Sequence, residues 1–291
     1  MLNLLVVSLI WAFSFGLIKG NLTGVDSNFV SFARLLISLV CFAPFLRRRG
    51  VGLRLGLRLA LTGALQYGVM YITYIYSFRF LQAYEVALFT IFTPLYVTAI
   101  NDALRGRFSR LNLLTAALAV VGAWIVRGGG AIQGGVLQGF LMMQVSNLCF
   151  AFGQVYYRRL LADRPAGLRD AHLFGFLYLG AAAVTALATT IFGGWGAIGM
   201  LTLSQALTLL YLGAIASGLG FFLWNVGARQ ASAGALAVFN NLKIPLAIAV
   251  SLLFFGEQAN TINLLLGGLV VAGALLLNER LRLRGEREAA V

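Results

Sequence analysis

The chain has 291 residues, of which 60% are hydrophobic and 11% are charged, and its mean hydropathy is +0.89. Soluble domains carry about 25% charged residues, so this chain lacks the polar side chains that would cover a surface in water. These proportions exclude an ordinary soluble domain and predict an all-α integral membrane protein surrounded by the lipid bilayer.

Ten apolar runs follow one another along the chain, separated by short clusters of Arg, Gly and Asn. A bilayer core about 30 Å thick needs about 20 mostly apolar residues in each helix that crosses it. We therefore predict transmembrane helices at roughly 2–19, 28–46, 57–78, 82–100, 111–127, 135–157, 171–192, 203–227, 231–255 and 261–279. The short connections predict antiparallel neighbours and leave no room for a separate soluble domain.

The basic residues indicate which ends of these helices face the cytoplasm. The chain has 22 Lys and Arg residues and a net charge of +13. In the predicted topology, the outside loops contain only Lys19, Arg79 and Arg127, and the helices contain only Arg34 and Lys243. The others lie in inside loops or in the C-terminal tail, so the positive-inside rule places both termini in the cytoplasm. The positive charge therefore indicates topology in a bacterial inner membrane, and no nucleic-acid partner is expected.

The two halves of the chain share short sequence matches in the same order. The matched segments are 11–19 with 150–158, 82–83 with 230–231, 94 with 245, and 113–123 with 264–274. With five helices in each half, the second half would enter the membrane in the opposite orientation to the first. Inverted repeats of this kind are typical of secondary transporters, which hold their substrate near the midplane. We predict two five-helix halves, 1–130 and 131–291, around a central cavity.

Three features of the chain carry a family resemblance. They are the Trp-x-x-Ser-Phe-x-x-x-Lys pattern from Trp11 to Lys19, Arg34 early in the second predicted helix, and Phe254-Phe255-Gly256-Glu257 followed by Gly267, Gly268 and Gly273. In these features the chain resembles the EamA-type, ten-helix members of the drug/metabolite transporter superfamily over nearly its whole length. Within that family, segments 83–86 and 224–227 are most similar to bacterial exporters of aromatic amino acids. The resemblance implies export of amino acids or related small metabolites.

Lys243 lies near the middle of the predicted helix 231–255. At 1.5 Å per residue, it is about 18 Å from either end, too far for its ammonium group to reach water. A charge at this depth costs roughly 2.5–3.5 kcal/mol on insertion scales, so it needs a cavity or a partner. We expect Lys243 either to bind a substrate carboxylate or to pair with an acidic residue such as Glu85. Asn240 lies on nearly the same helical face and could share the site.

The third predicted helix carries Tyr67, Tyr71 and Tyr74 at spacings of four and three residues. This spacing places the three side chains on one helical face. An aromatic face of this kind either lines a pocket for an apolar or cationic substrate group, or packs against neighbouring helices with its hydroxyls hydrogen-bonded.

The sixth predicted helix carries a stripe of amides, Gln144, Asn147 and Gln154. Lipid offers amides no hydrogen-bond partner, so the stripe either faces a cavity or bonds to other helices. On the eighth predicted helix, Trp224 and Asn225 are expected to complete the wall of this cavity.

Two further charged residues lie inside predicted helices. Glu85 lies near the outer end of the fourth, where it either contacts a substrate amine or carries a proton, or else pairs with a basic residue such as Arg79 or Arg34. For Arg34 itself we expect a structural ion pair or a cap.

Together these features predict an inner-membrane exporter of amino acids or related carboxylate metabolites, working as a monomer by alternating access. Lys243 and Asn240 would hold the carboxylate, and Glu85 would contact the amine. The alternatives are efflux of cationic drugs or amines, an uncoupled metabolite facilitator, and a scaffold that transports nothing. The only histidine, His172, and the two separated cysteines give no catalytic or metal-binding spacing. We therefore expect neither an enzyme nor a cofactor.

Overall fold

The computed structural model describes most of the chain. The described residues are 2–47, 49–104, 134–162, 167–231, 233–260 and 262–270, with side chains omitted for 233–238, and the isolated positions 106, 117–118, 121–122, 125, 273 and 276. These residues form helices and turns, and none of them forms a strand. The predicted all-α fold class is therefore confirmed. The predicted helix 111–127 lies almost wholly outside the described residues, as do the second half of the predicted helix 261–279 and the C-terminal tail.

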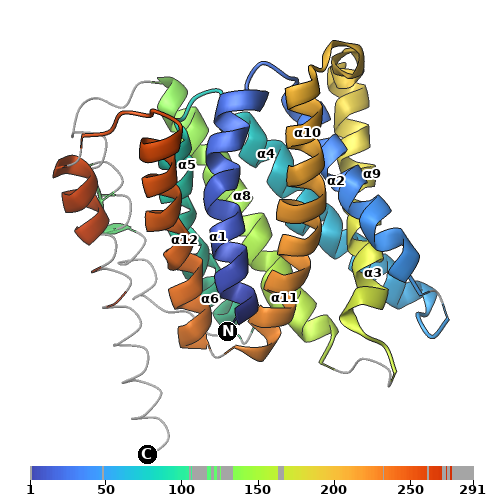
Figure 1. Cartoon of the computed structure of the whole chain (residues 1–291). Coiled ribbons are helices and arrows are strands. Elements are labelled where there is room, and N and C mark those ends of the chain that lie inside the picture. Colours follow the sequence, from blue (N-terminus) through green and yellow to red (C-terminus); the bar gives the residue numbers. More distant parts are fainter. Residues whose placement is uncertain are drawn as a thin grey trace, which may run out of the picture.

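Helices in the first half of the chain are often interrupted by turns of a different pitch (Figure 1). The described elements are α1 (Leu2–Leu17) and the π-helix η1 (Ile18–Leu22); α2 (Ser27–Phe42) and the 3₁₀-helix η2 (Ala43–Phe45); α3 (Leu53–Gly63), the π-helix η3 (Ala64–Val69) and α4 (Met70–Ser77); α5 (Ala83–Phe89), the 3₁₀-helix η4 (Thr90–Phe92) and α6 (Thr93–Ala103).

The second half repeats much of this pattern. Its described elements are α8 (Gly134–Leu160), α9 (Asp170–Phe192), the 3₁₀-helix η5 (Gly194–Met200), α10 (Leu203–Tyr211), the π-helix η6 (Leu212–Leu219), α11 (Gly220–Gln230) and α12 (Ala233–Phe254). In both α3–η3–α4 and α10–η6–α11, a π-helix joins two α-helices. The repeat itself stays a prediction, and this shared irregularity is consistent with it.

Six helical stretches are long and apolar enough to cross a bilayer. They are Leu2–Leu22, Ser27–Phe45, Ala83–Ala103, Gly134–Leu160, Asp170–Phe192 and Leu203–Gln230. Each coincides with a predicted helix, and α12 contributes a shorter apolar stretch, Phe239–Phe254. The stretch α3–η3–α4 is less apolar because it carries two arginines near its start and tyrosines and a glutamine further along. The chain is thus a multi-pass membrane protein, while the count of ten helices remains a prediction.

Proline residues divide the fourth predicted helix but not the ninth. The 3₁₀-helix η4 lies directly before Pro94, which is in the first turn of α6. A proline fits this position because the first turn of a helix has no partner for its backbone N–H. Pro245, in contrast, lies inside the continuous helix α12. The helix is therefore interrupted beside Pro94 and continuous at Pro245.

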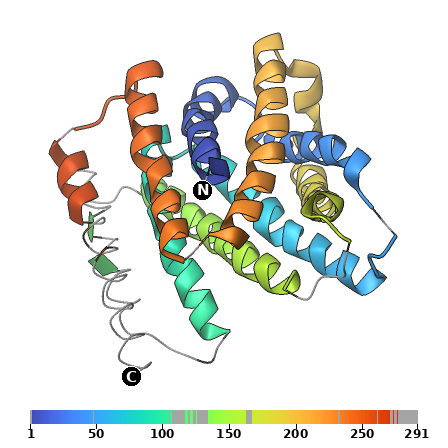
Figure 2. The ribbon, with the colours of Figure 1, turned by 60° about the horizontal axis from the view of Figure 1, so that its bottom comes forward.

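The helices of the two halves pack against each other rather than forming separate bundles (Figures 1 and 2). Helix α1 lies between α12 and α11, α9 packs against both α2 and α3, and α8 packs against α4 and α6. At the crossing of α3 and α9 the two backbones touch. A Cβ atom at Gly63 would overlap the backbone of Leu177, and one at Gly180 would overlap that of Ala60. Only glycine allows this approach.

The bundle has two ends, which we call the N-terminal side and the far side. The N-terminal side holds the start of α1 and residues 46–47, 49–52, 161–162, 167–169 and 230–231, and it is the lower end in Figure 1. The far side holds the turns at 23–26, 78–82, 193–202 and 255–260. The described parts of the predicted cytoplasmic loops lie on the N-terminal side.

Candidate functional site: a cavity between the two halves

A cavity lies in the middle of the bundle and is lined by both halves of the chain. Its empty volume is about 520 Å³ when the open mouth is included, and the space that the centre of a water molecule can reach is about 70 Å³. The lining residues are Trp11, Ser14, Phe15, Arg34, Met70, Tyr71, Tyr74, Thr90, Thr93, Met143, Ser146, Asn147, Phe150, Phe221 and Lys243. Aromatic and small polar side chains predominate, two residues are cationic, and none of these described lining residues is acidic.

Lys243 lies in the cavity wall within a cage of aromatic rings. Its side chain is 4% exposed, and its Nζ atom is 5.3 Å from the ring centre of Trp11, 5.7 Å from that of Phe150 and 5.8 Å from that of Trp224. Contacts of this kind attract a cation through the negative face of each ring. Among the described residues, no hydrogen bond or ion pair reaches Nζ. Pairing with Glu85, the structural alternative, is therefore not observed, and the ammonium group retains its capacity to bind an anion.

Arg34 is the second cation of the cavity, and its partners are hydroxyl groups. Its Nε donates to Ser217 Oγ at 3.2 Å and its Nη2 donates to Tyr71 Oη at 2.7 Å. The guanidinium carbon also lies 4.4 Å from the centre of the Tyr71 ring. The side chain is 2% exposed, and its Nη1 atom has no hydrogen-bond partner. The expected acidic partner is thus replaced by two hydroxyls, leaving a buried charge that no described acid neutralises.

A row of aromatic rings connects the two cations. From Lys243, the Trp11 ring is followed by the Phe221 ring at a centroid distance of 5.4 Å, and Phe221 by Tyr71 at 5.7 Å. All three rings line the cavity. Trp11 is fixed by a hydrogen bond of 2.8 Å from its Nε1 to the carbonyl oxygen of Ala216. The rings thus form a continuous apolar surface between the two cations.

Opposite helices contribute neutral polar groups to the wall. Asn147 donates from Nδ2 to the carbonyl oxygen of Phe89 at 2.7 Å, and its Oδ1 accepts from Thr93 Oγ1 at 3.3 Å. Phe89 directly precedes the 3₁₀-helix η4, where the regular α-helical bonding changes. Asn147 thus both lines the cavity and stabilises the interrupted fourth helix, so the two alternatives for the amide stripe are combined in one residue.

The three tyrosines predicted to share one helical face have different surroundings. Tyr71 and Tyr74 line the cavity, whereas Tyr67 is fully buried outside it. The Tyr67 ring stacks on Phe221 at 4.4 Å, and its hydroxyl accepts a hydrogen bond of 2.8 Å from Asn225 Nδ2. Tyr67 belongs to the π-helix η3, which has an extra residue per turn, so the regular α-helical spacing does not carry it onto the face of Tyr71.

The other amide candidates lie away from the cavity lining. Gln144 accepts a hydrogen bond of 3.1 Å from Tyr96, on α6. Gln154 is buried, and neither of its amide atoms has a hydrogen-bond partner. Asn240 is 1% exposed and its Oδ1 is likewise without a partner. None of the three lines the cavity.

Trp224 and Glu85 also have places outside the lining. Trp224 is fully buried behind Trp11, with ring centres 5.0 Å apart, and so contributes to the cage around Lys243 from the rear. The Glu85 carboxylate accepts a hydrogen bond of 2.9 Å from the backbone N–H of Gln82, in a capping box at the start of α5. Glu85 therefore stabilises a helix end in this structure.

On the far side, Glu257 joins the two halves above the cavity. Its carboxylate accepts from the backbone N–H groups of Ala83 at 2.7 Å and Tyr84 at 3.0 Å, at the N-terminus of α5. Nearby, Lys19 donates to the carbonyl oxygens of Phe78 and Leu81, both at 2.8 Å. The Glu257 contacts hold the segment after α12 against the start of α5, and the Lys19 contacts hold η1 against the turn at 78–82.

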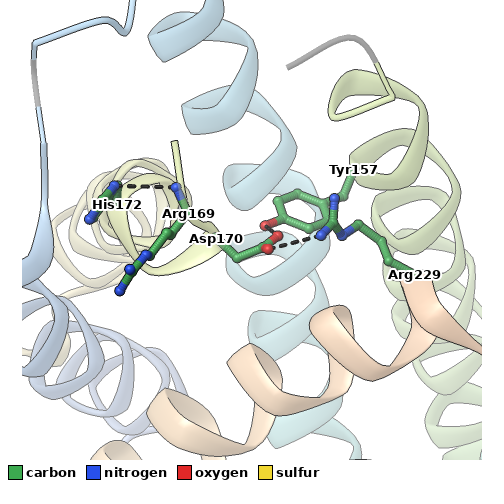
Figure 3. A network of polar contacts seen from close by, with 5 residues as sticks. All are labelled: Tyr157, Arg169, Asp170, His172 and Arg229. Atoms are coloured by element: carbon green, nitrogen blue, oxygen red, sulfur yellow. Dashed lines mark hydrogen bonds and ion pairs between the residues drawn. The ribbon is translucent and has the colours of Figure 1, made fainter. Parts of the chain in front are cut away.

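On the N-terminal side, a network of polar side chains lies within the second half (Figure 3). Asp170 accepts from Arg229 at 2.9 Å and from the Tyr157 hydroxyl at 2.9 Å, which ties α9 to α11 and α8. His172 caps the backbone N–H of Arg169 at 3.3 Å. The N-terminal side thus has a side-chain network within one half and a backbone hydrogen bond between the halves, from Arg47 N–H to the carbonyl oxygen of His172 at 3.2 Å. On the far side, the Glu257 carboxylate joins the halves.

Sequence reasoning missed several lining residues. Phe150, Met143 and Ser146 lie on the same helix as Asn147, and Thr90 and Thr93 flank the η4 break. Trp11 was singled out only as part of a family pattern. Its helical spacing of three and four residues from Ser14 and Phe15 is the signal that would have placed it on one face with them.

The chain is similar to named membrane transporters over almost its whole length. The EamA-like transporter family matches residues 1–128 and 137–279. A probable biotin transporter of Pseudomonas aeruginosa is 41% identical over 94% of this chain and 96% of its own. The biotin transporters of Salmonella typhimurium and Escherichia coli K12 are each 37% identical over 95% of this chain and 92% of their own. A crystal structure that is 19% identical shares the fold, with a TM-score of 0.67 over 96% of both chains.

Proposed function

Because the chain belongs to the EamA-like transporter family, we propose that it carries biotin, or a carboxylate of similar size and shape, across a bacterial inner membrane. The chain is a membrane transporter of small metabolites and not an enzyme. The choice of biotin is supported by the names of its relatives and by the chemistry of the cavity.

One observation carries this proposal: the cavity contains two cations, and none of its described lining residues is acidic. Biotin has a carboxylate, a flexible alkyl chain and a neutral ring system with a cyclic urea. The carboxylate suits Lys243, whose Nζ makes no hydrogen bond or ion pair among the described residues. The alkyl chain suits the aromatic row. A carboxylate brought from water into this cavity gains charge pairing that the empty cavity lacks.

The same cavity is less favourable for the other substrates that the sequence suggested. An amino acid brings an ammonium group as well as a carboxylate, and Glu85, its expected partner, is outside the lining. A cationic drug would be repelled by both Lys243 and Arg34. A scaffold would not require a polar cavity at the midplane.

The proposed mechanism is alternating access between two inverted halves, with both termini in the cytoplasm and the monomer as the working unit. The interlocked packing and the paired π-helices support two related halves. On the far side of the bundle, Glu257 makes a contact between the halves. Opening toward that side would require this contact to separate.

Counterflow in proteoliposomes tests the proposal. Vesicles preloaded with unlabelled biotin should take up labelled biotin faster than protein-free vesicles. Lys243→Ala should abolish this uptake, and Tyr67→Phe, outside the cavity, should retain it. Parallel vesicles preloaded with phenylalanine or with a quaternary amine test the alternatives. Exchange of those compounds without exchange of biotin would refute the proposal, and full activity of Lys243→Ala would refute the assignment of Lys243.

A further inference from the structure

We infer that Arg34 determines specificity by binding the carbonyl oxygen of the substrate's cyclic urea, at the other end of the aromatic row from Lys243. This inference rests on the proposed function and deepens it. It assigns the two polar ends of a biotin-like molecule to the two cations of one cavity.

Arg34 is positioned before any substrate arrives. Ser217 and Tyr71 hold its Nε and Nη2 atoms, and the Tyr71 ring lies against the guanidinium plane. These partners come from two different elements, η6 and α4, one in each half of the chain. The guanidinium group therefore has a fixed position and a fixed orientation in the cavity wall.

The hydroxyl protons in this cluster are fully assigned by its geometry. Ser217 Oγ donates to the carbonyl oxygen of Leu212 at 2.7 Å, five residues earlier in the π-helix η6. Because its single proton is used there, Ser217 must accept from Tyr71 Oη, 2.9 Å away, as well as from Arg34. Tyr71 in turn accepts from Arg34. Ser217 and Tyr71 are thus both committed, and the remaining hydrogen-bonding capacity of the cluster lies chiefly in donors of Arg34.

Those remaining donors require an acceptor. Nη1 of Arg34 is buried without a hydrogen-bond partner, in a residue that lines the cavity. An arginine stays protonated in proteins, so the unmet donor cannot be removed by losing a proton. A buried donor without a partner is unfavourable. A ligand oxygen placed in the cavity at this end would satisfy it with a charge-assisted hydrogen bond.

The two cations suit different acceptors. All three N–H groups of Lys243 lack acceptors among the described residues, so Lys243 can pair fully with a carboxylate. Arg34 already donates to two hydroxyls and retains a small, directed set of donors. Such a set fits a neutral carbonyl oxygen, and the urea carbonyl of biotin is a strong acceptor because two nitrogens feed electron density to it. The alkyl chain between them then lies along Trp11, Phe221 and Tyr71.

Binding competition on the purified full-length protein separates the two ends. Labelled biotin is displaced by biotin itself, by lipoate, which has the carboxylate but no urea, and by biotinamide, which has the urea but no carboxylate. Each inhibition constant is measured for the wild type, Arg34→Gln and Lys243→Gln. Vesicle counterflow of biotin by the wild type is measured in parallel as the test of the proposed function.

We expect Arg34→Gln to weaken biotin and biotinamide about tenfold or more while lipoate changes less than about twofold. Lys243→Gln should show the reverse pattern, weakening biotin and lipoate but not biotinamide. Tyr71→Phe, which keeps the ring and releases Nη2, should weaken the two urea compounds by a smaller factor and leave lipoate unchanged. If Arg34→Gln does not fold, Tyr71→Phe tests the inference in its place.

Equal losses for biotin and lipoate in Arg34→Gln and in Tyr71→Phe would overturn the inference. The inference would also be overturned if Arg34→Gln weakened biotin and lipoate but not biotinamide. If the wild type transports biotin but the variants leave the ratios between the three inhibition constants unchanged, this inference fails and the proposed function stands. If the wild type neither binds nor transports biotin, the proposed function fails together with it.

Discussion

The two cations of the cavity are held in opposite ways. Lys243 is surrounded by three aromatic rings and makes no hydrogen bond among the described residues, whereas Arg34 is fixed by two hydroxyls and one ring. Contacts between a cation and a ring depend weakly on direction, so the ammonium group can move to follow a ligand. Hydrogen bonds of a guanidinium group are directional. One end of the cavity is therefore suited to select by charge and the other by shape.

The largest expected effect comes from reversing the charge at the Lys243 end. Lys243→Glu would place one carboxylate against another, which costs several kcal/mol. We expect the initial rate of biotin counterflow to fall by about 100-fold or more. Lys243→Arg, which keeps the charge in the cage, is the matched control and should retain part of the rate. A Lys243→Glu variant with wild-type transport would show that charge selection does not occur at this end.

A smaller effect is expected from loosening the Arg34 end without touching the arginine. Ser217→Ala removes the acceptor for both Arg34 Nε and Tyr71 Oη. The two donors left unmet in this buried site each cost about 1–3 kcal/mol of stability. Because the guanidinium group then loses its fixed position, biotin should bind about tenfold more weakly. The affinity for lipoate, measured by the same competition assay, should not change. A parallel loss of lipoate affinity would mean that Ser217 supports the whole cavity rather than its shape-selective end.

A still smaller effect is expected from weakening the cage. Trp11→Phe retains a ring but loses the hydrogen bond to Ala216 and the strongest of the cation–ring partners. The change corresponds to about 0.5–1 kcal/mol, or a two- to fivefold weaker binding of biotin and lipoate. Biotinamide, which lacks the charge that Lys243 binds, should be unaffected. If biotinamide weakens equally, Trp11 acts through packing and not through the ammonium group.

The smallest effect on transport is expected from Tyr67→Phe, which lies outside both ends. The substitution removes the hydroxyl that accepts from Asn225. We expect unchanged affinities for all three ligands and a loss of stability of about 1 kcal/mol, visible as a lower midpoint in thermal unfolding. Altered ligand selectivity in this variant would show that the cavity extends to Tyr67 in another conformation.

Much of the fold follows from the sequence because lipid imposes simple rules. Continuous apolar runs of sufficient length have few alternatives to a spanning helix, and six of the predicted helices meet the length and composition needed. The position of Lys243 in a cavity wall follows from the same reasoning, since its depth required a cavity or a partner. The use of the site by substrate remains a proposal.

The parts that sequence could not give depend on irregular helices and distant partners. Regular spacing placed Tyr67 with Tyr71, but the π-helix η3 lies between α3 and α4 and shifts the phase of the helix. For Arg34 the sequence suggested an ion pair or a cap, because hydroxyl partners 37 and 183 residues away leave no local pattern. For Gln144 it left open a cavity or a bond to another helix; the structure has the bond, to Tyr96, because the rotation of a helix relative to its neighbour is a property of packing.

The interlocked packing of the two halves also bears on how the protein is made. Helix α1 finds its main partners in α11 and α12, which are among the last described helices to leave the ribosome. Gly16 in α1 lies so close to the ring of Phe255 that a Cβ atom at this position would overlap the ring. Phe255 follows α12, so this contact also forms late in synthesis. Helices in lipid are stable individually and associate afterwards. The first half therefore enters the bilayer as separate, loosely associated helices, and the cavity comes into existence only when synthesis of the chain is nearly complete.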